Sequence, residues 1–245
     1  MCEVDIVPYF TLGFPDNRTL LDFLGRIPDK SVGRMEFGFQ SPDPKYDGPQ
    51  IKQTHRSLRS GSDIDNAEIF RTERNSGIKL YALVYYADHE EKFGSFLENL
   101  IDSGFSGIIL PDILMDYFGN RFDIIRSVRE SGLEFIPFFT PATPDGVIRD
   151  VSKSTESWIY YGLQPSTGIT VPFDLDSVVS RIREILPERE IVFGFGIKDV
   201  SEVIRLKKLG ASGAAIGSVF VNYLKNRDIE GFETLMKTLL EGSGA

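Results

Sequence analysis

Short apolar runs alternate with amphipathic segments along the whole chain, and this alternation predicts a repeated strand–helix unit. Eight apolar runs have the length of buried strands, over residues 6–12, 32–39, 79–85, 106–110, 134–139, 157–161, 190–193 and 211–216. Helical spacing of apolar residues follows each run, over residues 18–26, 50–59 with 65–74, 91–101, 117–130, 145–153, 175–185, 200–209 and 218 to about 240. Asn17 is expected to cap the first of these helices.

The predicted strands are continuously apolar rather than alternating, which is typical of a parallel sheet that helices cover. Eight such units in 245 residues match one (β/α)8 barrel, the TIM barrel, with residues 1–245 as a single domain. An open doubly wound sheet is the alternative. It usually has fewer strands and a glycine fingerprint after the first one, whereas here the glycine motifs follow the seventh and eighth strands.

Composition narrows the classes of partner and site. The chain is 41% hydrophobic and carries a net charge of −9, which argues against nucleic acid or an anionic membrane as a partner. Its single cysteine, Cys2, indicates a reducing, cytoplasmic setting. His55 and His89 lack metal-ligand spacing, so we expect no metal site, and His55 is expected on a helix surface. No apolar run approaches the roughly 20 residues of a membrane span.

Two carboxylates mark the second strand–helix connection. Glu36 lies inside the apolar run 32–39, and Asp47 follows 47 − 36 = 11 positions later in an Asp-Gly-Pro turn. Burying a carboxylate costs free energy unless it is paired, protonated or used in chemistry. General acid–base catalysis often uses two carboxylates, one buried away from solvent and one more exposed to it. The structural alternative is that Glu36 pairs with an arginine at a strand end and Asp47 caps a helix.

Other polar residues fall at the carboxyl ends of the predicted strands, where barrels of this kind place their active sites. These candidates are Tyr9, Tyr85, Asp112 and Tyr160. For Asp112 a helix N-cap is the better interpretation, and Tyr161 is expected to pack in the core or on the outer side of the barrel.

Glycine motifs after the last two strands predict a phosphate site. Gly194-Phe195-Gly196 follows the seventh strand, and Gly217-Ser218 opens a helix after the eighth. Glycine allows close approach to the backbone, and the N–H groups at a helix N-terminus bind anions. The long loop 162–173 after the sixth strand has the length of an active-site lid.

Motifs along nearly the whole chain resemble the alpha subunit of tryptophan synthase. They occupy residues 8–13, 36–38, 43–44, 47–49, 109–112, 140–144, 160–161, 168–170, 194–197 and 217–218. The combination of Glu36 with Asp47-Gly48-Pro49 is the most specific of them. The sequence departs from the bacterial pattern at residues 39–42, at Lys45-Tyr46 and at Val171, and the looser match is closer to archaeal members.

The resemblance implies retro-aldol cleavage of indole-3-glycerol phosphate to indole and glyceraldehyde 3-phosphate, a carbon–carbon lyase reaction of tryptophan biosynthesis. Glu36 matches the general acid–base at indole C3, and Asp47 matches the carboxylate that holds the indole N–H. Substrate-binding positions match Tyr9, Tyr85 and Tyr160, and phosphate-binding positions match Gly168, Val171, Gly196, Ile197, Gly217 and Ser218.

The resemblance also implies a partner, a beta subunit that carries pyridoxal phosphate and takes up the indole in a heterotetramer. Asp43 and Pro44 match its interface, and no cofactor is expected in this chain. Two alternatives stay open. One is another phosphate-binding TIM-barrel enzyme, an isomerase or transferase, and the other is a non-catalytic activator or scaffold of a partner.

Overall fold

The computed structural model describes residues 4–28, 31–58, 77–163, 174–194, 196–197 and 199–244. Within them the strands are β1 (Asp5–Thr11), β2 (Arg34–Gly38), β3 (Lys79–Leu83), β4 (Gly107–Ile109), β5 (Glu134–Ile136), β6 (Phe138–Phe139), β7 (Ile159–Gly162), β8 (Ile191–Gly194) and β9 (Gly213–Ile216). All strand pairs are parallel, in the order β5-β4-β3-β2-β1-β9-β8-β7-β6.

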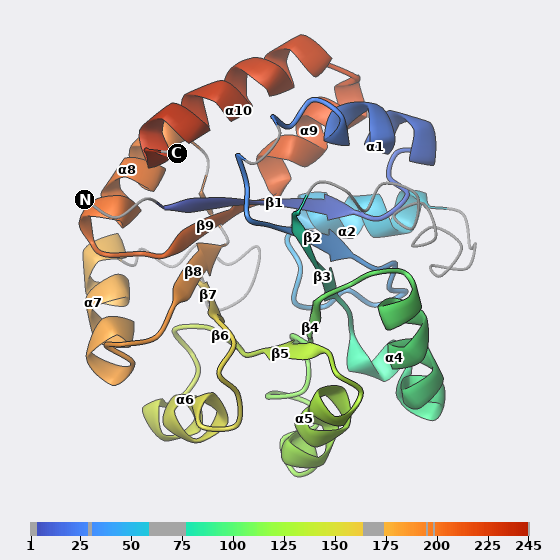
Figure 1. Cartoon of the computed structure of the whole chain (residues 1–245), viewed down its shortest axis with the longest axis vertical. Coiled ribbons are helices and arrows are strands. Elements are labelled where there is room, and N and C mark those ends of the chain that lie inside the picture. Colours follow the sequence, from blue (N-terminus) through green and yellow to red (C-terminus); the bar gives the residue numbers. More distant parts are fainter. Residues whose placement is uncertain are drawn as a thin grey trace.

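The two end strands of this order, β5 and β6, are halves of one apolar run that Pro137 interrupts. Proline has no N–H to donate to a ladder, but its carbonyl accepts the N–H of Tyr160 at 2.9 Å. β5 pairs with β4 and β6 pairs with β7, so the covalent chain itself completes the ring of strands. The eight predicted strands are therefore all present, and the (β/α)8 barrel is confirmed (Figure 1).

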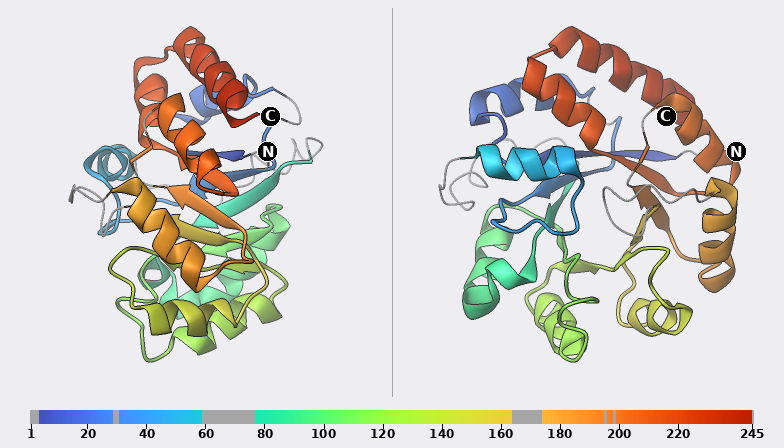
Figure 2. Two further views of the ribbon diagram at one scale, coloured as in Figure 1. Left: turned by 90° about the vertical axis from the view of Figure 1, so that its left-hand side faces the viewer. Right: turned by 180° about the vertical axis from the view of Figure 1, so that it is seen from behind.

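Helices surround this ring on the outside (Figures 1 and 2). They are α1 (Asn17–Leu24), α2 (Pro49–Ser57), α4 (Phe93–Asp102), α5 (Arg121–Glu130), α6 (Asp145–Ser152), α7 (Leu175–Ile185), α8 (Val200–Lys208), α9 (Ser218–Asn226) and α10 (Ile229–Ser243). Two 3₁₀ turns, Tyr86–Asp88 and Glu90–Lys92, precede α4. The helix expected from residue 117 begins only at Arg121, and the one expected over residues 65–74 lies outside the described residues.

The cap of α1 is Asp16 and not Asn17, so that prediction is wrong. Asp16 has extended backbone (φ −159°, ψ 159°), which is the conformation a cap requires, while Asn17 is already helical. The Asp16 carboxylate accepts the N–H of Thr19 at 2.8 Å and its hydroxyl at 2.9 Å.

Residues of β1 and β2 alternate between the inside of the barrel and the helical layer. Phe10 and Phe37 pair in register, and Phe10 packs outward against Phe220 and Phe232 of α9 and α10, with ring centroids 5.9 Å and 6.4 Å away. Their neighbours Tyr9 and Glu36, which also pair in register, therefore share the inner face. This alternation places the candidate acid inside the barrel.

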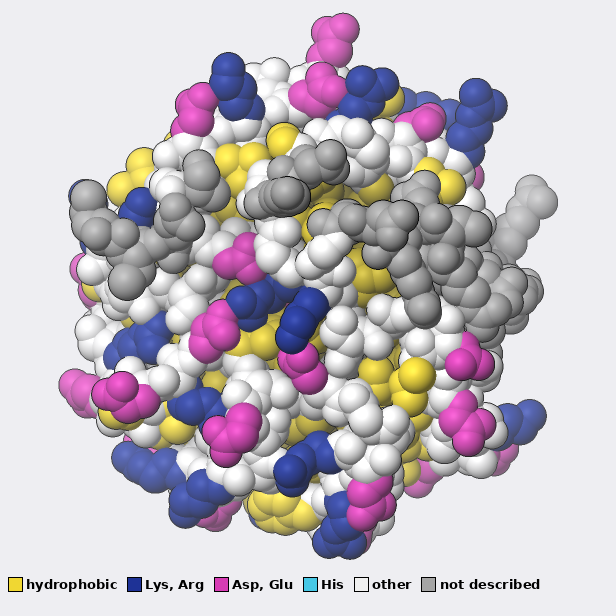
Figure 3. Space-filling model, in the orientation of Figure 1, with side chains coloured by type: hydrophobic (Ala, Val, Ile, Leu, Met, Phe, Trp, Pro, Cys, Tyr) yellow, Lys and Arg dark blue, Asp and Glu magenta, His cyan; other side chains and the backbone are white. Residues whose placement is uncertain are grey.

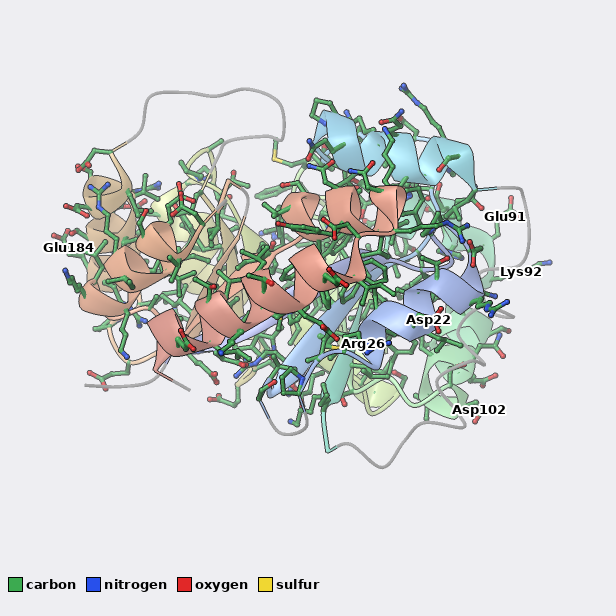
Figure 4. All side chains as sticks on the ribbon, turned by 90° about the horizontal axis from the view of Figure 1, so that it is seen from above. Asp22, Arg26, Glu91, Lys92, Asp102 and Glu184 are labelled. Atoms are coloured by element: carbon green, nitrogen blue, oxygen red, sulfur yellow. The ribbon has the colours of Figure 1, made fainter. Side chains whose placement is uncertain are left out.

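The outer faces of the helices carry charge. Figure 4 shows the labelled side chains pointing away from the barrel, and each of them is exposed: Asp22, Arg26, Glu91, Lys92, Asp102 and Glu184. On the face drawn in Figure 3, acidic and basic side chains are interspersed. None of the described helices is both long enough and apolar enough to cross a membrane.

Candidate active site

Glu36 is fully buried on β2, and neither carboxylate oxygen has a hydrogen-bond partner among the described residues. Burial raises its pKa well above the ordinary value, with a smaller opposing effect from the charge of Arg34. Arg34 itself pairs with Asp5 at 2.7 Å and with Glu190, so among the described residues Glu36 is not the partner of an arginine. An unpaired, buried carboxyl is a group held ready for a ligand.

Asp47 lies in the loop after β2 and is only 3% exposed, so the expectation of a wetter second carboxylate is wrong. It does not cap α2 either, because Gly48 is the cap residue and no side chain caps that helix. Burial raises the pKa of Asp47 to about 6, against the lowering effects of a hydrogen bond from Tyr85 and the charge of Lys52. Both structural alternatives for the two carboxylates are thus excluded.

Tyr85 follows β3 and reaches Asp47 from the neighbouring strand. Its hydroxyl accepts the N–H of Tyr46 at 3.0 Å, and it donates to Oδ2 of Asp47 at 2.9 Å. A backbone N–H can only donate, so the single proton of the hydroxyl is left for the carboxylate. Tyr85 therefore holds Asp47 in place, in addition to any role as a wall of the pocket.

Tyr9 and Tyr160 occupy spaces that glycines leave open. A Cβ on Gly38 would lie 2.0 Å from the Tyr9 hydroxyl, and one on Gly217 would lie 2.8 Å from its ring. A Cβ on Gly194 would lie 2.0 Å from the Tyr160 hydroxyl. Contacts this short do not occur, so these glycines are required by the two tyrosine rings.

The carboxylates and these two tyrosines form one electrostatic cluster. Burial raises the pKa of both Tyr9 and Tyr160 far above the ordinary value, and the charges of Asp47 and Glu36 raise each further. The structure thus brings Tyr9, Glu36, Asp47, Tyr85 and Tyr160 together from four strand–loop units at the carboxyl ends of the strands.

His55 belongs to this site as well, so the expectation that it lies on a helix surface is wrong. It is 1% exposed, its Nδ1 accepts the N–H of Ser41 at 3.0 Å, and its Nε2 lies 3.8 Å from Oδ2 of Asp47. The available signal was spacing, because Ile51, Thr54 and His55 share the buried face of α2. Burial lowers the pKa of His55 to about 4, so the ring is neutral at neutral pH.

Asp112 is not a cap on the helix that follows it, and that interpretation is wrong. It is fully buried, and its two oxygens accept the N–H groups of Tyr86 and Ala87 at 3.0 Å each, at the start of the 3₁₀ turn after β3. Its role is to tie two adjacent loops together. Tyr161 packs on the outer side as expected, against Phe193 and 3.4 Å from Arg181 of α7.

The phosphate candidates lie at the ends of two paired strands, β8 and β9. Gly196 has φ +103°, a conformation that favours glycine. Gly217 is the cap residue of α9, Ser218 is its first residue, and no side chain caps this helix, so its first N–H groups can meet an anion. Ile197 is buried beside Gly196. Gly168 and Val171, with most of the expected lid, lie outside the described residues.

A cavity of about 630 Å³ opens at the other end of the barrel, where the strands begin. It is lined by Arg34, Lys79, Glu134, Trp158 and Glu190, among others. Its charges satisfy one another, since Lys79 pairs with Glu134 at 2.8 Å and Arg34 pairs with Glu190 and lies over the Trp158 ring. Residues at this end of such a barrel usually serve stability, so we do not take it as the catalytic site.

The loops after β2 and β4 are joined at the rim of the barrel. The Tyr46 hydroxyl donates to Asp116 at 3.1 Å, and Lys45 forms an ion pair with the same carboxylate. Next to this junction Met115 is 62% exposed and Phe118 is 46% exposed. Of the two expected interface residues, Asp43 is exposed, but Pro44 is buried within the chain itself.

The described residues contain no group of three or more His, Cys, Asp or Glu side chains that could hold a metal ion. The arrangement found here has instead a buried acid with a raised pKa, a second carboxylate held by a tyrosine, and helix amides suited to an anion. Such a set can protonate a substrate, stabilise a positive charge and hold a phosphate.

Comparison with known proteins agrees with this arrangement. The family model for the tryptophan synthase alpha chain matches residues 2–242. The alpha chain of Saccharolobus solfataricus is 30% identical over 95% of this chain and 94% of its own, and that of Sulfurisphaera tokodaii is 27% identical over 96% and 95%. A Pyrococcus furiosus structure of the tryptophan synthase α2β2 complex superposes with a TM-score of 0.80 at 25% identity over 100% of both chains. The chain therefore belongs to the tryptophan synthase alpha chain family.

Proposed function

We propose that this chain cleaves indole-3-glycerol phosphate to indole and glyceraldehyde 3-phosphate. Family membership supports the reaction, and one structural observation carries it: Glu36 is fully buried with both oxygens unpartnered among the described residues. A non-catalytic scaffold has no need of such a costly buried acid, and another phosphate-binding barrel enzyme offers no reason for Glu36 and Asp47 together.

Glu36 serves as both acid and base in this proposal. Burial raises the pKa of Glu36 and thereby favours its protonated form, which can give its proton to C3 of the indole ring. The resulting carboxylate then takes the proton of the adjacent glycerol hydroxyl as that carbon becomes the aldehyde. The bond between the ring and the glycerol carbon breaks, its electron pair restores the indole, and Glu36 is protonated again.

Asp47 is proposed to face the indole N–H. Protonation at C3 places a positive charge on the ring nitrogen, and a fixed anion beside it binds the transition state more tightly than the neutral ground state. The hydrogen bond from Tyr85 keeps the carboxylate in one orientation. Although burial raises the pKa of Asp47 to about 6, this value still lies below 7, so the carboxylate is mostly ionised at neutral pH.

The remaining residues position the substrate. Tyr9 and Tyr160 are proposed to border the indole ring, and the amides of Gly196, Ile197, Gly217 and Ser218 are proposed to bind the phosphate. Gly168 and Val171 keep their assignment as phosphate-binding residues from the resemblance alone.

A beta subunit is the proposed partner, because the similar Pyrococcus furiosus protein is an α2β2 complex. Asp43 and the exposed Met115 and Phe118, which lie on two joined loops, form the proposed contact surface, and the burial of Pro44 argues against a direct contact there. Pyridoxal phosphate is assigned to that partner and no cofactor to this chain. The cytoplasmic setting stays a prediction.

The test is release of indole from indole-3-glycerol phosphate by the purified chain, with Glu36→Gln and Asp47→Asn beside it. We expect cleavage by the parent, and a loss of about a hundredfold or more in kcat for Glu36→Gln with substrate binding retained. A parent that releases no indole, even with a matched beta subunit, would favour another phosphorylated substrate. A parent that only accelerates its partner would favour the scaffold alternative.

A further inference from the structure

One buried N–H group near Asp47 has no role in the reaction described so far. His55 is 1% exposed, and its Nε2 has no hydrogen-bond partner among the described residues. Oδ2 of Asp47 lies 3.8 Å away, which is an ion-pair distance but too long for a hydrogen bond. A buried polar atom without a partner costs free energy, so its retention calls for a use.

The proton on the His55 ring can be placed from its neighbours. Nδ1 accepts the backbone N–H of Ser41 at 3.0 Å, and a backbone N–H can only donate, so Nδ1 carries no proton. A neutral imidazole then has its proton on Nε2. The group that faces Asp47 is therefore a donor.

The helix that carries His55 is held firmly at that point. The side-chain amide of Gln40 donates to the carbonyls of His55 and Leu58 at 3.0 Å and 3.1 Å. The hydroxyls of Thr11 and Thr54 lie 2.6 Å apart, which ties α2 to β1. Asp47 lies on a loop, so a small rotation of its side chain is the simplest way to close the gap to Nε2.

We propose that His55 is a positioning residue for Asp47: its Nε2–H donates to the Asp47 carboxylate in the substrate complex and, with the Tyr85 hydroxyl, holds that carboxylate against the indole. The inference rests on the proposed function. The two donors come from different elements, Tyr85 from the residues after β3 and His55 from α2. Two fixed donors favour the ionised carboxylate, which is the form needed to stabilise a cationic ring.

Five titratable groups among the described residues face Asp47, and a test of His55 must leave the other four unchanged. They are Lys52 and His55 from α2, Tyr85 after β3, Tyr9 from β1 and Tyr160 from β7. A change made only at His55 leaves the other four in place.

Two variants separate the two nitrogens of His55. In His55→Asn the amide oxygen can still accept from Ser41, but no donor reaches Asp47. In His55→Gln the amide nitrogen can take the place of Nε2, but the acceptor for Ser41 is lost. We expect His55→Asn to lower kcat about tenfold and to move the acidic limb of the kcat profile, which reports the substrate complex, up by about one pH unit. His55→Gln should keep the parent's limb and most of kcat, with a lower Tm.

The opposite ranking, with His55→Gln the more damaged in kcat, or an unmoved acidic limb in His55→Asn, would overturn the proposal. Should both variants fail to fold, nitrogen NMR of the parent decides, because the chain has only two histidines. Binding of a non-cleavable indole alkyl phosphate must shift the Nε2–H proton of His55 downfield; an unshifted resonance with ligand bound overturns it. A parent without cleavage activity would instead contradict the proposed function.

Discussion

Tyr85 donates its hydroxyl proton to Oδ2 of Asp47 at 2.9 Å, across 38 positions of sequence. The same hydroxyl accepts the N–H of Tyr46 at 3.0 Å, in the residue just before Asp47. Tyr85, which follows β3, thus holds both the side chain of Asp47 and the backbone of its loop. This contact connects the loop after β2 to the barrel wall. It also lowers the pKa of Asp47, so its removal should change the pH dependence of the reaction.

Tyr85→Phe should move the acidic limb of the kcat/KM profile upward. The pKa of Asp47 is about 6 with this hydrogen bond in place, because burial raises it and the bond partly offsets that effect. Loss of the hydroxyl removes the offset, so the pKa should rise further. We expect a shift of about one pH unit and about a tenfold fall in kcat/KM below that limb. Tyr117→Phe is the control, because its hydroxyl bonds Glu90 on the surface at 3.0 Å. An unmoved limb would show that Tyr85 does not set the ionisation of Asp47.

Asp47→Asn should change how stability depends on pH. Burial raises the pKa of Asp47 in the folded chain to about 6 from its ordinary value of 3.8, so the protonated carboxyl contributes stability that is present below about pH 4 and is lost as the pH rises through 6. The parent should therefore lose about 2 kcal/mol relative to Asp47→Asn between pH 4 and pH 7. Urea unfolding at both pH values measures the difference, with the exposed Asp43→Asn as control. A difference that does not vary with pH would contradict the raised pKa.

Gly196→Ala should weaken substrate binding through the phosphate. Gly196 has φ +103°, which an alanine adopts only with strain, so the turn after β8 must shift. We expect KM to rise about tenfold with a smaller effect on kcat. Gly132→Ala is a matched control, because Gly132 has φ +94° and open space around it, but precedes β5 at the other end of the barrel. Equal KM values in both variants would argue against a phosphate at Gly196.

Met115→Glu should weaken assembly with a beta subunit. Met115 is 62% exposed beside the ion pair of Lys45 and Asp116, and a charge there opposes burial in an interface. We expect at least a tenfold higher Kd by titration calorimetry, with indole release by the isolated chain unchanged. Unaltered affinity would place the interface elsewhere.

The isolated chain is also expected to turn over slowly until the beta subunit binds, so equal turnover with and without the beta subunit would contradict activation.

The fold could be predicted because its signals are local. An apolar run predicts each buried strand, and a helical spacing of apolar residues predicts each helix. The helix α7 begins and ends at the residues expected, Leu175–Ile185. Errors occurred at boundaries that depend on backbone conformation, such as the cap at Asp16 and the late start of α5 at Arg121. The strand expected over residues 134–139 is divided at Pro137 because its two halves pair with different neighbours where the barrel closes. Apart from the proline, nothing in the local sequence predicts this division.

The site was predictable only in part. An acid within an apolar run identified Glu36 without a structure, and motif resemblance supplied the role of Asp47. The sequence did not predict the contacts of His55 with Ser41 and Asp47, or that of Asp112 with the loop after β3. The polarity of a residue does not show whether its side chain faces the core or the solvent.

By itself, then, the sequence determined the barrel, the buried acid and the glycine-bearing turns, since those depend on hydrophobic periodicity and on backbone freedom within a few residues. Only the tertiary structure decided which polar groups meet. The burial of Asp47, its hydrogen bond from Tyr85 and the orientation of the His55 ring arise where β1, β2, β3 and α2 converge. Their energies depend on desolvation, and desolvation is a property of the packed barrel and not of any one segment.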